Sequence, residues 1–89
     1  MINVTVQNDE LQDLFVTVFD LNQAVNQVVL NAVRLNRGQG SQIAIQDDSD
    51  GNGHVQWQTN LAGAPQTVRT GDASNLQDGD IVRVLAGGT

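Results

Sequence analysis

The segment LNQAVNQVVLNAVRLNR, residues 21–37, decides the fold class of this chain because it fits two different secondary structures. With the spacing of a helix its apolar residues form one stripe, and Gly38 would end the helix. With the two-residue spacing of a strand they divide between two faces of a sheet. The helical stripe consists of Leu21, Val25, Val28, Ala32 and Leu35, whereas a strand places Val29, Val33 and Leu35 on one face and Val28, Leu30 and Ala32 on the other.

The residue types in this segment favour the extended alternative. Valine is restricted at its first side-chain torsion in a helix, and asparagine side chains compete for the hydrogen bonds of a helical backbone. The segment contains no glutamate or lysine, so it lacks the oppositely charged pairs, four residues apart, that support exposed helices. We therefore predict extended structure here and keep a helix over residues 21–36 as the alternative.

The rest of the chain carries strand signals separated by turn residues. Strands are predicted at 2–7, 14–19, 41–46, 55–59, 66–70 and 80–85. The stretch 71–79 is rich in Gly, Asp, Ser and Asn and is predicted to be a loop. Six or seven short strands predict an all-β fold, a small antiparallel β-sandwich or barrel. Its predicted core comprises Ile2, Val4, Val6, Val16, Val18, Leu30, Ile43, Ile45, Val55, Trp57, Val68, Ile81 and Val84.

Composition narrows the classes of function. The chain has 89 residues and no cysteine, so disulfides cannot stabilise it. Four arginines stand against ten acidic residues, which gives a formal net charge of −6. Without a basic face we expect neither nucleic-acid binding nor a membrane partner. No secretory signal or transmembrane segment is recognised, so we expect a cytoplasmic protein with a single domain over residues 1–89 and a flexible tail at 86–89.

A short acidic motif lies in the predicted turn at residues 47–53. Asp48, Asp50 and Asn52 alternate and are followed by glycine, which matches the first half of an EF-hand calcium loop. The twelfth position, which should hold a bidentate glutamate, is Thr59. We therefore predict either an ordinary hairpin turn or a weak calcium site with Asp48, Asp50 and Asn52 as its side-chain ligands.

Catalytic chemistry finds little support in the sequence. His54 is the only histidine, there is no cysteine, and no serine lies in a nucleophile-elbow pattern. A zinc site needs several histidine or cysteine ligands, which this chain lacks. We therefore predict that the protein is not an enzyme.

The C-terminal stretch gives an alternative. Residues 76–84 place a strand after an Asp-Gly-Asp turn, and Gly87 and Gly88 follow. This end resembles that of ubiquitin-like sulfur-carrier proteins. The resemblance implies a β-grasp fold, with residues 21–36 as its helix, and a carrier or enzyme-accessory subunit that acts through the C-terminal diglycine. Thr89 departs from the family pattern, because it would have to be removed before Gly88 could react.

The function that the sequence favours is a non-enzymatic interaction or structural module. Sheet edges need protection against pairing with other chains, and this chain has no lysine to provide it. We therefore expect self-association as a homo-oligomer, through an edge or an apolar face, or binding to a protein partner. Trp57 is predicted to be a core residue or an interaction anchor rather than a platform for a ligand.

Overall fold

The computed structural model describes residues 1–23 and 27–84, and only the backbone of residues 64–67. These residues form strands and no helix, so the all-β prediction is confirmed. The strands are β1 (Ile2–Asn8), β2 (Leu14–Asp20), β3 (Gln27–Leu35), β4 (Gly40–Ile45), β5 (Gly53–Leu61), β6 (Ala64–Leu76) and β7 (Ile81–Val84).

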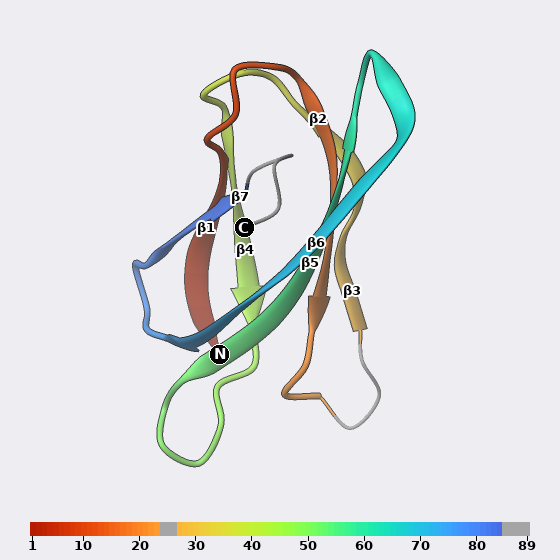
Figure 1. Cartoon of the computed structure of the whole chain (residues 1–89). Coiled ribbons are helices and arrows are strands. Elements are labelled where there is room, and N and C mark those ends of the chain that lie inside the picture. The colour runs from red at the N-terminus through yellow and green to blue at the C-terminus, as the bar shows by residue number, and fades with distance from the viewer. Residues whose placement is uncertain (24–26, 85–89) are drawn as a thin grey trace.

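The strands form two sheets that face one another as a sandwich (Figure 1). The small sheet has the order β4-β1-β7, and the large sheet has the order β3-β2-β5-β6. Neighbouring strands are antiparallel except for β1 and β7, which are parallel, with Thr5 opposite Ile81 and Asn8 opposite Val84. The first and the last strand of the described chain are therefore direct neighbours.

The hydrophobic core lies between the two sheets and follows from the alternation in each strand. In β2, for example, Leu14, Val16 and Val18 are buried, whereas Phe15 and Phe19 are only half-buried. The buried apolar residues are Val4, Val6, Leu14, Val16, Val18, Leu30, Leu35, Ile43, Ile45, Val55, Trp57, Leu76, Val82 and Val84.

Two residues of the predicted core are in fact on the surface. Val68 is 43% exposed and Ile81 is 47% exposed. The error at Ile81 is one of parity, since successive residues of a strand point to opposite faces and β7 turns Val82 and Val84 inward. Val68 lies directly opposite Asn60 in the register of β5 and β6.

The predicted alternative with a helix over residues 21–36 is wrong, because Gln27–Leu35 form β3. This strand pairs with β2 from Leu14 opposite Leu35 to Asp20 opposite Gln27. Its register shifts near Ala32, which has a φ of 50° and donates its backbone N–H to Oγ1 of Thr17 at 3.1 Å. This bulge turns both Leu30 and Leu35 inward although they are five positions apart, which is why strict alternation did not describe the segment.

Strand β6 is longer than predicted, because residues 71–76 continue it instead of forming a loop. They pair with β5, where Gly71 lies opposite Trp57 and Leu76 opposite Gly53. A Cβ at Gly71 would lie 2.6 Å from Cε2 of the Trp57 indole. The ring therefore occupies the space that any larger residue at this position would need, and glycine is required by packing.

Two further predictions concern the C-terminal tail and membrane-spanning segments. The predicted flexible tail at residues 86–89 lies outside the described residues. Within the described residues, no helix has the length and apolar character required to cross a membrane.

We predict that Gly71→Ala destabilises the protein by about 1–3 kcal/mol, since the added methyl group overpacks the core at the Trp57 ring. The control is Gly63→Ala, because no atom lies within 4 Å of a Cβ built there. Urea unfolding followed by Trp57 fluorescence measures both variants. Equal losses in the two variants would contradict the close contact between Gly71 and Trp57.

Candidate functional site

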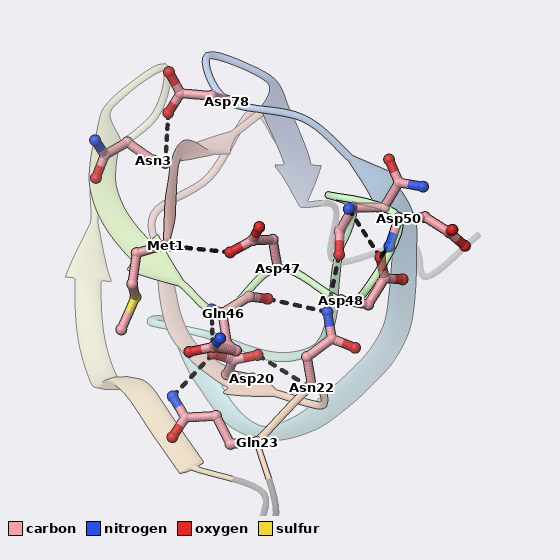
Figure 2. A network of polar contacts seen from close by, with 11 residues as sticks. Met1, Asn3, Asp20, Asn22, Gln23, Gln46, Asp47, Asp48, Asp50 and Asp78 are labelled. Atoms are coloured by element: carbon pink, nitrogen blue, oxygen red, sulfur yellow. Dashed lines mark hydrogen bonds and ion pairs between the residues drawn. The ribbon is translucent and has the colours of Figure 1, made fainter.

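The acidic turn predicted as a calcium loop connects β4 to β5, and Asp48 organises it (Figure 2). Oδ1 of Asp48 accepts backbone N–H groups from Asp50 at 2.9 Å and from Asn52 at 3.0 Å. The backbone N–H of Asp48 donates to the Asn52 carbonyl at 2.8 Å, and Gly51 adopts a φ of 83°. Asp48 thus closes the turn with bonds that aspartate commonly makes to its own local backbone.

Asp47, beside this turn, is paired with the amino group of Met1. The Met1 nitrogen donates to Oδ1 of Asp47 at 2.8 Å. This hydrogen bond is the main reason that the pKa of the Asp47 carboxyl lies below its ordinary value, and a backbone hydrogen bond lowers the pKa further.

No three His, Asp or Glu side chains come together as metal ligands within residues 1–23 and 27–84. Asp48, Asp50 and Asn52 do lie in one turn, but one oxygen of Asp48 is already committed to backbone donors. Calcium binding by these three residues therefore stays a prediction.

A buried carboxylate, Asp20 at the end of β2, lies next to this turn (Figure 2). Its oxygens accept three hydrogen bonds, from the backbone N–H of Asn22 at 3.2 Å, from Nε2 of Gln23 at 3.0 Å and from the backbone N–H of Gln46 at 2.8 Å. Gln46 directly follows β4, so the Asp20 carboxylate joins the large sheet to the small one. Burial of a carboxylate is tolerated only when donors satisfy it in this way.

Asn22 completes the connection. Its Nδ2 donates to the Gln46 carbonyl and to the Asn52 carbonyl, both at 3.0 Å. The backbone N–H of Gln46 therefore donates to Asp20, and the backbone carbonyl of Gln46 accepts from Asn22. This arrangement is structural, because its polar groups are bonded to one another.

Trp57 lies in the core, with 5% of its surface exposed. This position agrees with the core alternative of the prediction. Little of the Trp57 surface is exposed for the anchor alternative, which stays a prediction. The diglycine at Gly87 and Gly88 lies outside the described residues, and the helix on which the β-grasp fold depends is replaced by β3.

The outer face of the large sheet carries aromatic and apolar side chains that the sequence analysis did not place there. The register aligns its outward-facing residues in two rows across β3, β2, β5 and β6 and in one row between them across β2, β5 and β6. Phe15 and Phe19 lie there half-buried, and Val28 and Val68 are 45% and 43% exposed. The sequence signal was the run Leu14–Phe19, which is apolar on both faces although only one face meets the core.

Charged groups lie at two corners of this face. At one corner, Nη2 of Arg34 donates to Oδ2 of Asp13 at 2.8 Å, and the guanidinium lies 6.0 Å from the centre of the Phe15 ring. At the other corner, Oδ2 of Asp72 lies 3.8 Å from Nε2 of His54. The hydrogen bond from Arg34 is the main reason that the pKa of Asp13 lies below its ordinary value, and the backbone N–H of Arg37 adds to the effect.

Comparisons of the chain with protein-family models, with curated proteins and with solved structures gave no match.

We predict that Asp20→Asn destabilises the protein by about 1–3 kcal/mol. Both oxygens of the Asp20 carboxylate accept N–H donors, so the NH₂ group of an asparagine would face at least one N–H donor and leave it without an acceptor. Asp50→Asn is the matched control, since Asp50 is exposed, and it should change stability by less than about 0.5 kcal/mol. Urea unfolding measures both. A loss as small for Asp20→Asn as for the control would contradict the role of this carboxylate.

The Asp13 carboxyl gives a prediction about pH. Because its pKa is lower in the folded than in the unfolded chain, its stabilising effect is complete above the unfolded pKa and is lost as the pH falls through the folded pKa. The wild type should therefore be more stable than Asp13→Asn near pH 6, and the difference should shrink as the pH falls below about 4. Urea unfolding at several pH values tests this, and a difference independent of pH would contradict it.

Proposed function

We propose that this protein is a non-enzymatic interaction module that self-associates through the outer face of the large sheet. The observation that carries the proposal is the composition of this face. Phe15 and Phe19 lie on its central strand β2, and exposed Val28 and Val68 lie on its two edge strands.

The face is uncharged between its corners and carries two aromatic rings there. Between the corners it presents phenylalanine, threonine, glutamine and asparagine, and its charged groups, Arg34, Asp72 and His54, lie toward its margins. Interface cores are enriched in aromatic residues and depleted of charge in the same manner. The chain has a net charge of −6, and its acidic residues lie mostly elsewhere on the surface.

The edges of the large sheet are less suited to association than its face. The bulge near Ala32 interrupts β3, and register shifts and the positive φ of Asn75 interrupt β6. Irregular edges of this kind oppose strand addition by a second chain. For the large sheet, the face is therefore a better supported route to self-association than either edge.

We predict a reversible dimer whose population rises with concentration between about 1 μM and about 1 mM, as small interfaces bind weakly. Phe19→Gln should raise the dissociation constant by about tenfold or more, because it removes an aromatic ring from the face. Leu11→Gln is the control, since Leu11 is 71% exposed but lies in the connection before β2. Sedimentation velocity measures all three proteins.

A mass of one chain over the whole concentration range would overturn the proposal. A dimer that both substitutions weaken equally would place the interface elsewhere.

A further inference from the structure

Strand β7 forms one edge of the small sheet, next to β1 (Figure 1). Along a strand, the backbone N–H and C=O groups of one residue point to one side, and those of the next residue point to the other side. β1 and the residue after it donate N–H groups to the carbonyls of Asp80 and Val84, at 2.9 Å and 3.1 Å. The even-numbered residues of β7 therefore face β1, and the backbone groups of Ile81 and Arg83 face away from it.

No strand lies beside these outward groups. Within residues 1–23 and 27–84, β7 pairs with β1 alone. At the opposite side of the sandwich β3 lies against β4, whereas no comparable contact among the described residues brings β6 against β7. The free side of β7 thus presents two N–H donors and two carbonyl acceptors, from Ile81 and Arg83, that no described strand satisfies.

β7 is also the least protected of the four sheet edges. The bulge near Ala32 interrupts β3, register shifts interrupt β6, and β4 lies against β3. In contrast, the register of β7 with β1 is regular, and three of its four residues are β-branched. Regular, β-branched edges are the ones to which further strands add. The shortness of β7 limits the strength of such a contact, because only two of its residues face outward.

A second copy of the chain fits this edge because the edge is complementary to itself. A two-fold axis perpendicular to the sheet sets β7 antiparallel to its copy. In antiparallel strands, two opposite residues whose backbone groups face each other exchange two hydrogen bonds. When Ile81 lies opposite Arg83 of the second copy, symmetry repeats the pair. Every outward N–H and carbonyl of both copies then takes part in one of four hydrogen bonds.

The two other symmetric registers leave part of the edge unpaired. Arg83 opposite its own copy makes only two hydrogen bonds among the described residues and sets like charges side by side, which is unfavourable. Ile81 opposite its own copy places Arg83 opposite Gly79. Gly79 has a φ of 92° and already donates its N–H to the Asn3 carbonyl at 2.8 Å, so it does not continue the pairing.

We infer that a second copy of this chain pairs antiparallel with β7, with Ile81 opposite Arg83, so that the two small sheets join into one sheet of six strands. The inference goes beyond the proposed function, because this edge is separate from the outer face of the large sheet. Copies that are joined through that face can therefore be joined again through β7.

The side chains of β7 suit this register. Val82 is buried on the inner face and lies on the axis, where it meets only its own copy and extends the apolar layer. On the outer face, exposed Ile81 lies beside the aliphatic stem of Arg83 from the second copy. Arg83 keeps a charge of opposite sign nearby, since its Nη1 lies 3.7 Å from Oδ1 of Asp9. The contact therefore buries no unpaired charge.

The first test removes the outward N–H of Ile81. Ile81→Pro deletes this donor and leaves the bonds between β7 and β1, and proline is tolerated at the first residue of an edge strand. In a chain that also carries Phe19→Gln, where association through the large sheet is weakened, it should raise the dissociation constant of the remaining dimer at least about tenfold. Ile81→Thr in the same chain is the control, because it changes the same side chain but keeps the N–H. It should change the constant by less than about threefold.

Sedimentation velocity up to about 1 mM measures these variants, and urea unfolding verifies that each is folded. The second test uses cysteines, which the chain lacks. In the inferred register, Ile81→Cys of one copy lies opposite Arg83→Cys of the other, with about 5.5 Å between Cα atoms, which a disulfide can span. Two copies of the same variant hold these positions about 7–8 Å apart, beyond the reach of a disulfide. Copper phenanthroline should therefore link the mixture and give little linked dimer with either variant alone, and intact mass identifies the linked chains.

The outcomes separate the two proposals. If the wild type associates but Phe19→Gln keeps the mass of one chain up to about 1 mM, and the cysteine mixture forms no link, the proposed function stands and the edge contact is overturned. Linkage by one cysteine variant alone, as strong as in the mixture, overturns the register. A wild type with the mass of one chain throughout, without linkage, overturns both proposals. Linkage in the mixture alone, with a loss for Ile81→Pro and not for Ile81→Thr, supports the edge contact.

Discussion

The buried carboxylate of Asp20 is the constraint on which the rest of this sandwich depends. It lies at the end of β2 in the large sheet and accepts the backbone N–H of Gln46, which follows β4 in the small sheet. The opposite end has a counterpart in Asn8, also buried, whose Nδ2 donates to the carbonyls of Leu35 and Gln12 at 2.9 Å and 2.8 Å. An apolar core alone tolerates sliding of one sheet over the other, whereas satisfied polar groups at both ends fix a single arrangement.

With the sheets fixed in this way, β2 has two different apolar faces. Leu14, Val16 and Val18 fill the core, while Phe15 and Phe19 face outward from the middle of the large sheet. A strand with this pattern is usually covered on both sides. The described chain supplies only the inner cover, so the outer aromatic side chains cost solvation energy in the single chain. The proposed association would relieve that cost.

The class of fold could be predicted because alternation of apolar residues is local. Val4 and Val6, or Ile43 and Ile45, define an inner face without knowledge of any partner strand. The predictions that failed depend on contacts between residues that are not neighbours in the sequence. The sequence does not show that pairing with β5 makes residues 71–76 a strand, or that Trp57 covers Gly71. Asp20 and Asn8 were missed as well, although a signal was present, since each continues the inward alternation of its strand and places a polar group where a valine would be expected. The alignment of residues on the outer face of the large sheet depends on the strand order, which no local sequence pattern contains.

The parallel pairing of β1 with β7 has a consequence for how the chain reaches its structure. Thr5 in β1 pairs with Ile81 in β7, so the small sheet cannot be completed by contacts between residues that are close in sequence. Folds dominated by such distant pairings form in milliseconds to seconds rather than microseconds. During synthesis on the ribosome, one edge of β1 stays unpaired until residues 81–84 of β7 have emerged. The small sheet is therefore completed late, and shorter chains that lack β7 expose the unpaired edge of β1.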